Sequence, residues 1–254
     1  VSTSLRYKFT DSKTLNFRYN YSVSNPTASQ ILPYERFNDP LNTFIGNADL
    51  DQTKNHSANL SFRDYNFQLR TGWTVGLSGN FYDSQIVATT VFDENRKRTT
   101  TYQNVSGAYS LGLYGNYNKS KKFDAHTFRY GIGFRANYGL SRGFTNNELY
   151  ENNVLTLTPR IYGTWDYGEF LTIAPSYSLE YNNNTYSNLA LDKTEYVVHR
   201  INLQTTTYWP KNLTWGNDFG YNYNTNIAPG FKKDFFLWNT SLGYDFLKET
   251  LTAK

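Results

Sequence analysis

Residues 128–140 alternate between apolar and polar side chains. One parity holds only apolar residues, namely Phe128, Tyr130, Ile132, Phe134, Ala136, Tyr138 and Leu140. The other parity holds arginine, asparagine and glycine. Because successive side chains of a strand point to opposite faces, this pattern predicts a strand with one apolar and one polar face. About ten to twelve tilted residues cross a hydrocarbon core of roughly 30 Å, so the segment is long enough to span a membrane.

The same alternation recurs along the chain and predicts about eleven long strands joined as hairpins. Short polar turns are expected at residues 11–13, 64–66, 119–122, 166–169 and 210–212. Longer loops are expected at residues 25–53, 85–103, 143–153, 182–194 and 226–233. Short turns at one end and long loops at the other are typical of outer-membrane barrels. The predicted fold is therefore an all-β, antiparallel transmembrane β-barrel in the bacterial outer membrane, with its long loops outside the cell. A soluble β-sandwich is the alternative, although sandwich strands usually have only about five or six residues.

The composition agrees with strands that have one face in lipid and one in water. The 254 residues include 23 Tyr, 18 Phe and 5 Trp, with no Cys and no Met. No apolar run reaches the length of about 18 residues that a transmembrane helix needs. The absence of Cys excludes disulfides and cysteine-based chemistry. The net charge of +4 is scattered along the strands rather than clustered, so nucleic acid is not an expected partner.

An odd number of strands has a consequence for the barrel. Single-chain bacterial barrels have even strand numbers, and an open edge in lipid leaves backbone groups unpaired. A count of about eleven therefore predicts either one missed strand or a barrel completed by sequence outside this chain. The missing initiator Met and the end at Lys254 favour the second explanation. Residues 1–254 are interpreted as one barrel domain or as a segment of one.

Aromatic residues gather near the predicted short turns and the chain end. Tyr and Trp rings favour the membrane–water interface. We expect these side chains to form a girdle on the periplasmic side: Tyr7, Phe9, Phe67, Trp165, Tyr167, Phe170, Trp209, Trp215 and Phe246. The alternative is ordinary pairing of aromatic residues across strands.

Basic residues occupy the polar phase of the predicted strands. They are Arg6, Lys8, Arg18, Arg63, Arg70, Arg129, Arg135, Arg160 and Arg200. A charge that faces lipid at mid-membrane costs about 2–4 kcal/mol, so these side chains should face the barrel lumen. Fewer acidic residues accompany them, namely Glu180, Asp218 and Asp245. One hypothesis is a basic inner wall that contacts an anionic substrate or an acidic plug surface. The other is a solvated lumen with incidental ion pairs.

No pattern in the chain predicts an enzyme. His56, His126 and His199 are isolated, without a second ligand at metal-binding spacing. No phosphate-binding loop, Ser-His-Asp arrangement or paired-carboxylate motif stands out. We therefore expect no catalytic residues, cofactor or metal. A surface protease or lipase is the enzymatic alternative.

The loop after the second predicted strand carries a recognisable signature. It reads NPTASQILPYERFNDPLNTFIGNADL, with matches at Pro33, Asp39, Pro40, Leu41, Asn42, Gly46, Asn47, Asp49 and Leu50. Ala48 stands where the signature usually has Pro. This segment resembles TonB-dependent receptor barrels, and the Asn- and Tyr-rich strands resemble the SusC-related outer-membrane barrels of Bacteroidota. The signature covers roughly one tenth of the chain, and the other hairpins are compatible with it.

The resemblance implies a barrel of about 22 strands in the complete protein, preceded by a plug domain and a TonB box. We recognise neither the plug nor the TonB box in this chain. The implied function is TonB-dependent nutrient uptake, and the alternative is a non-transporting barrel that scaffolds a complex. The expected partners are membrane lipid, lipopolysaccharide, a plug and TonB from outside this sequence, and an outer-membrane lipoprotein.

Overall fold

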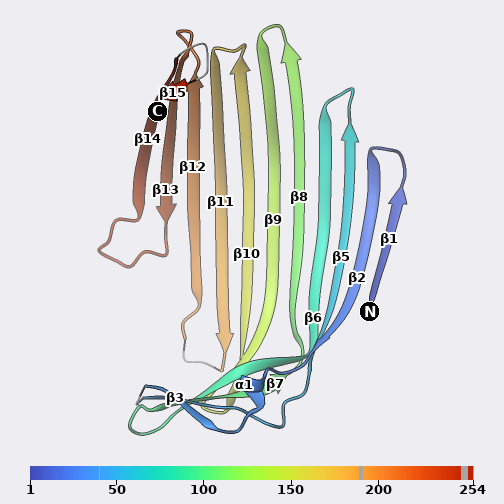
Figure 1. The fold of residues 1–254 in the computed structure, drawn as a ribbon, viewed down its shortest axis with the longest axis vertical. Coiled ribbons are helices and arrows are strands. Elements are labelled where there is room, and N and C mark those ends of the chain that lie inside the picture. The colour runs from blue at the N-terminus through green and yellow to red at the C-terminus, as the bar shows by residue number, and fades with distance from the viewer. Residues whose placement is uncertain (40, 189–190, 247–250, 254) are drawn as a thin grey trace.

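The computed structural model describes residues 1–39, 41–188, 191–246 and 251–253 as one large sheet of 15 strands with one short helix (Figure 1). The helix α1 is Ala28–Ile31. The strands are β1 (Ser2–Lys8), β2 (Lys13–Ser24), β3 (Glu35–Asp39), β4 (Asn42–Ile45), β5 (Thr53–Asn66), β6 (Thr71–Phe92), β7 (Arg98–Val105), β8 (Ala108–Phe123), β9 (His126–Thr145), β10 (Glu148–Tyr167), β11 (Leu171–Ser187), β12 (Thr194–Thr207), β13 (Leu213–Asn224), β14 (Asp234–Phe246) and β15 (Leu251–Ala253).

The main sheet is an antiparallel meander. Its order is β1-β2-β5-β6-β8-β9-β10-β11-β12-β13-β14-β15, so every strand pairs with its neighbours along this path. The strands that precede β15 on this path are the ones that the alternating pattern predicts. The predicted series of long strands is therefore confirmed. Within the described residues, no pairing joins β1 to β14 or β15, so the sheet is open at both edges.

Apart from the tight turn between β9 and β10, the short connections lie at one end of the sheet and the long ones at the other, as predicted (Figure 1). Two of the expected turns are nevertheless misplaced. Residues 64–66 belong to β5, and the turn is at residues 67–70. Residues 119–122 belong to β8, and the turn lies at Asp124 and Ala125. Charged side chains at these strand ends are solvated while the ladder continues. The residues with positive φ, Arg70 and Asp124, mark where the chain reverses.

The predicted long loop at residues 143–153 is wrong. β9 continues to Thr145 and β10 begins at Glu148, and these two residues pair directly. Only Asn146 and Asn147 form the turn, with φ of 51° and 65°. Two consecutive residues with positive φ suit a tight hairpin, and Asn tolerates that conformation. The polar composition therefore reflects strands exposed to water rather than an irregular loop. Similarly, β11 extends to Ser187, beyond the predicted strand end.

The long connections build a small subdomain at the end of the sheet that holds α1, β3 and β7 (Figure 1). β6 extends to Phe92 and pairs with β7, so most of the expected loop at residues 85–103 is a projecting hairpin. β4 pairs in parallel with β7 and antiparallel with β3. Thr43, Thr89 and Thr100 are almost completely buried here. The least exposed side chains of the described residues thus lie in this subdomain and in the extension of β6 that joins it.

The DPLN signature is part of this subdomain. The Gly46 amide donates to the Leu32 carbonyl over 3.1 Å, and a Cβ at Gly46 would collide with that carbonyl. The Asn47 side-chain amide donates to the carbonyl of Tyr102 on β7 over 2.9 Å. Asn47 therefore ties the loop to the projecting hairpin. Pro40 of the signature lies outside the described residues.

Candidate functional site

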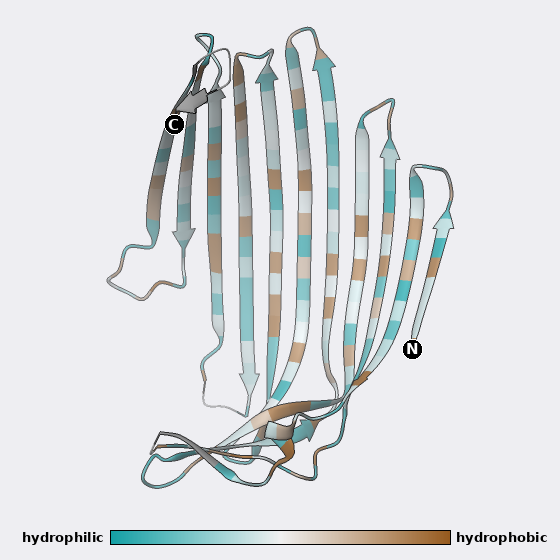
Figure 2. Ribbon diagram, in the orientation of Figure 1, coloured by the Kyte–Doolittle hydropathy of each residue, from teal (hydrophilic) through white to brown (hydrophobic). Residues whose placement is uncertain are grey.

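The sheet has one apolar face, and that face is exposed. On β9, Phe128, Tyr130, Ile132, Phe134 and Tyr138 are 36–57% exposed. The alternation of hydrophilic and hydrophobic residues recurs along most of the long strands (Figure 2). A water-soluble fold would bury such a set, because burial of apolar surface is the main force for folding. The exposed apolar face confirms the predicted strand phase.

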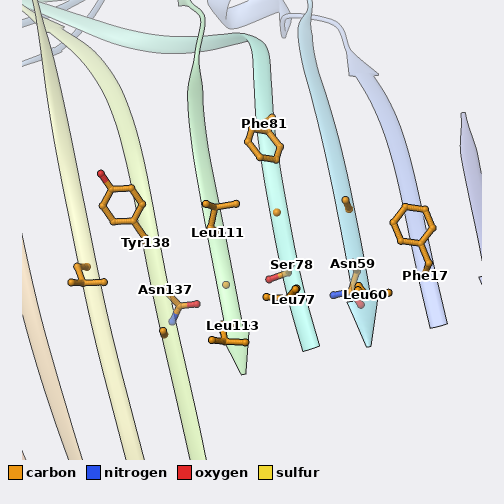
Figure 3. Close-up of a pocket in the computed structure, with 15 residues that line it drawn as sticks. Phe17, Asn59, Leu60, Leu77, Ser78, Phe81, Leu111, Leu113, Asn137 and Tyr138 are labelled. Atoms are coloured by element: carbon orange, nitrogen blue, oxygen red, sulfur yellow. The ribbon is translucent and has the colours of Figure 1, made fainter. Parts of the chain in front are cut away.

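The apolar face is hollowed where small residues meet across strands (Figure 3). Ala58 and Gly79 are direct cross-strand partners. Around them Phe17, Phe81 and Leu111 line a recess of about 450 Å³. The side chains that face it are largely apolar, so this surface matches hydrocarbon rather than a polar ligand.

The opposite face is polar, and six of its cations fall into three successive cross-strand rows. One row runs through Ser4, Arg18, Asn59, Ser78, Gly112 and Asn137. The next runs through Arg6, Asn16, Ser61, Gly76, Tyr114 and Arg135. The third runs through Lys8, Thr14, Arg63, Thr74, Asn116, Gly133 and Arg160. We call these the cationic rows. None of the residues listed in them is acidic.

Carboxylates on the polar face belong to strands nearer the C-terminus. Arg129 Nη2 lies 2.6 Å from Asp166 Oδ2 on β10, and the same carboxylate accepts a hydrogen bond from Thr172. Arg200 donates to Glu180 Oε2 on β11 over 2.7 Å. Asp218 follows on β13. Two of the predicted cations, Arg129 and Arg200, are therefore neutralised by an acidic neighbour.

The other candidate cations have different surroundings. The Arg160 guanidinium lies 5.3 Å from the centroid of the Tyr162 ring, a cation–π contact. Arg18, Arg63 and Arg135 form no ion pair with any of the residues that the structure describes. The charge of the polar face is thus unevenly distributed, with unpaired cations over β1, β2, β5 and β9.

Arg70 is a correction to the predicted set. It lies in the turn between β5 and β6 with φ of 50°, so it belongs to no strand face. The alternating pattern predicts a strand position for Arg70, but the ladder between β5 and β6 ends at Asn66 and Thr71.

Sequence reasoning missed two features of the polar face. The sequence predicts a turn at residues 166–169, but Asp166 continues the polar phase of β10 and pairs with Arg129. Tyr162 covers Gly131, its direct partner on β9, and its hydroxyl donates to Asn116 Oδ1 over 3.2 Å. Continued parity could have revealed Asp166. The Tyr162 contact depends on register, which composition does not supply.

The three histidines lie on the apolar face, each hydrogen-bonded to an aromatic residue. Trp165 Nε1 donates to His126 Nδ1 over 3.1 Å, and the Tyr177 hydroxyl lies 2.9 Å from His199 Nδ1. No group of three side chains that could hold a metal ion occurs among the described residues. These histidines supply polar contacts within aromatic clusters.

His56 has two partners. Its Nδ1 lies 2.6 Å from the Tyr19 hydroxyl, and its Nε2 lies 2.8 Å from Asp83 Oδ2. The register shift beside Lys54 leaves Asp83 without a cross-strand partner, and such a bulge redirects a side chain. The bulge thus brings a carboxylate to the histidine.

Replacing His56 with Phe should lower the free energy of unfolding by about 0.5–1.5 kcal/mol, because the Tyr19 hydroxyl loses its partner. Urea unfolding in lipid vesicles, followed by tryptophan fluorescence, measures the change. Asp83→Asn keeps a hydrogen-bonding group and should cost less. Equal stability of His56→Phe and the wild type would contradict this expectation.

Aromatic rings gather beside the short turns. Phe123, His126, Phe128, Trp165 and Tyr167 form a continuous set of ring contacts with centroids 5.0–6.5 Å apart. The predicted girdle residues at this end of the sheet are also exposed, including Tyr7, Phe9, Phe67, Phe170, Trp209 and Trp215. Members of the predicted set such as Trp165 and Phe9 therefore contact aromatic rings of another strand, while the role of the set as a membrane girdle stays a prediction. The side chain of Phe246 lies outside the described residues.

One charged pair lies at the long-loop end of β12. Lys193 Nζ is 2.6 Å from Glu195 Oε2, and the Tyr181 hydroxyl donates to Glu195 over 2.8 Å. The hydrogen bond with Glu195 raises the pKa of Lys193, and the hydrogen bonds from Lys193 and Tyr181 lower the pKa of Glu195. Both groups therefore stay charged at neutral pH.

Comparisons with known proteins identify the chain at the level of its family. Among the residues that the structure describes, no helix is long and apolar enough to cross a membrane. No curated protein matches the sequence. The model of the outer membrane protein beta-barrel family matches residues 2–254. The chain therefore belongs to the outer membrane protein β-barrel family and is a protein of the bacterial outer membrane.

Proposed function

We propose that the protein forms the barrel wall of a TonB-dependent transporter for nutrient uptake, related to the SusC-like receptors of Bacteroidota. The observation that carries this proposal is the division of the sheet into an exposed apolar face and a polar face rich in Arg, Asn, Ser and Thr. One face suits lipid, and the other suits a water-filled path for a solute. The resemblance of the DPLN loop to TonB-dependent receptors supports the proposal that TonB supplies the energy for this transport.

The open edges of the sheet support a larger barrel. The free edge of β1 and the part of β14 that β15 does not cover would leave backbone amides and carbonyls unpaired in hydrocarbon, at a cost of several kcal/mol per group. We therefore propose that further strands complete the sheet in the membrane. We propose a barrel of about 22 strands with a plug inside it.

In the proposed mechanism, the subdomain of α1, β3, β4 and β7 captures the solute outside the cell. The solute then passes along the polar face once an energised partner has remodelled the plug. No covalent step is required, so the proposed role is not enzymatic. Hydrolysis of a peptide or lipid by the purified protein would contradict it.

Uptake measurements test the proposal. A strain that lacks the gene should lose accumulation of at least one compound from a radiolabelled panel of phosphate, citrate, oligosaccharides and short peptides. A protonophore should abolish this accumulation in the wild type, because transport through a plugged barrel depends on an energised inner membrane. Reintroduction of the gene should restore it.

A scaffolding role is the second candidate. The pairing of β7 with β4 and with the extension of β6 places a small sheet beyond the long strands, which offers a surface to other outer-membrane proteins. Unchanged uptake of the whole panel, together with stable co-isolation of other outer-membrane proteins, would favour this role over transport.

A further inference from the structure

A polar recess lies between the first strands of the sheet. It measures about 440 Å³ and is lined on the polar face by Ser4, Arg6, Asn16, Arg18, Asn59 and Ser61. These residues come from β1, β2 and β5, and they are direct cross-strand partners in two adjacent cationic rows. The recess is therefore formed by regular ladder pairing rather than by a loop.

The polar lining residues of this recess can all donate hydrogen bonds, and none carries a carboxylate. Arg6 and Arg18 have no ion pair within the described chain, in contrast to Arg129 and Arg200. A guanidinium presents paired N–H groups that match the oxygens of phosphate, sulfate or carboxylate. We propose that this recess binds an oxyanion group of a small solute, with Arg6 and Arg18 as its charged ligands.

The neighbouring cations offer further positions to which a bound anion could move along the polar face. Lys8 and Arg63 lie one row closer to the short turns, and Arg135 shares the row of Arg6. Rows two residues apart along a strand are about 6.8 Å apart. Successive cations at this spacing allow an anion to move from one row to the next, as basic side chains do in anion-selective pores.

The shape of the recess favours a small solute over an acidic protein segment. Its volume is within the range of small-molecule sites, about 300–1,000 Å³. Asn and Ser groups beside the guanidiniums can also orient a compact ligand. The assignment of the oxyanion to a transported solute rests on the proposed transport function, whereas binding itself does not.

Binding measurements on the full chain in detergent micelles test the site. Inorganic phosphate, sulfate and citrate are titrated separately by calorimetry at constant ionic strength. At least one should bind, and Arg6→Gln and Arg18→Gln should each weaken it about tenfold or more, because each removes a charge-assisted hydrogen bond. The probe that binds most tightly identifies the oxyanion.

Arg70→Gln is the matched control, because it removes the same charge from a turn outside the recess. It should leave the affinity unchanged. Heat modifiability on gels checks that each variant is folded. Binding of none of the three anions, or equal weakening by Arg70→Gln, would overturn the proposal. So would binding of hexaglutamate alone, since that outcome assigns the cations to an acidic protein segment.

The two proposals fail separately. In one outcome, Arg6→Gln and Arg18→Gln lose anion binding while the deletion strain shows no uptake defect. That outcome would support the binding site and contradict the transport function. Energised uptake by a protein that binds no oxyanion would support the transport function and contradict the binding site.

Discussion

Gly131→Ala should destabilise the folded protein by about 1–3 kcal/mol or more, among the largest effects we expect from a single methyl group. A Cβ at this position would lie 2.5 Å from Tyr162 Cζ and 2.7 Å from the backbone carbonyl oxygen of Tyr117. The Tyr ring could move, but the carbonyl belongs to the β8–β9 ladder. The strand itself must therefore shift. Urea unfolding in lipid vesicles and heat modifiability on gels measure the loss.

Gly115→Ala is the matched control on the neighbouring strand. A Cβ at Gly115 meets nothing within 4 Å, so this variant should be as stable as the wild type. In a Tyr162→Ala background, Gly131→Ala should cost less, because one of its two collisions is gone. Equal stability of Gly131→Ala and Gly115→Ala would contradict the close contact between β9 and its neighbours.

Ile132→Arg should destabilise the protein in a membrane by about 2–4 kcal/mol. Ile132 lies on the apolar face of β9 and is 57% exposed, so the new charge would face hydrocarbon. Folding into vesicles, compared at equal urea concentration, should shift towards the unfolded form. The yield of protein in the outer membrane should fall with it.

Asn137→Arg serves as the control for this charge. Asn137 is on the polar face of the same strand, in the row of Arg18. The same guanidinium there should cost much less, because water solvates it. If both variants were equally destabilised, the assignment of one face to lipid and the other to the lumen would be wrong.

Much of the fold follows from local pattern. Period-two alternation predicts the long strands, and parity along each strand places Arg18, Arg63, Arg129, Arg135, Arg160 and Arg200 on the polar face. Strand ends were less predictable. Residues 143–153 are polar because they face water, and polarity alone does not separate a solvated strand from a loop. Asn146 and Asn147 reverse the chain where a longer connection was expected.

The candidate site depends on register, which joins residues far apart in sequence. Arg129 is paired because Asp166 lies within 2.6 Å, whereas the direct cross-strand partners of Arg6 and Arg18 are uncharged. Nothing in the local sequence around these arginines separates the two situations. The turns and the bulge at Asp83 set how strands align, and a shift of one residue would exchange the two faces.

The sequence by itself determined that this protein has strands with one apolar and one polar face, because side-chain direction in a strand alternates residue by residue. Only the tertiary structure decided which cations lack an acidic neighbour and which glycine is covered by an aromatic ring from the next strand. Those contacts form between separate strands, so they arise only once the ladder has aligned them.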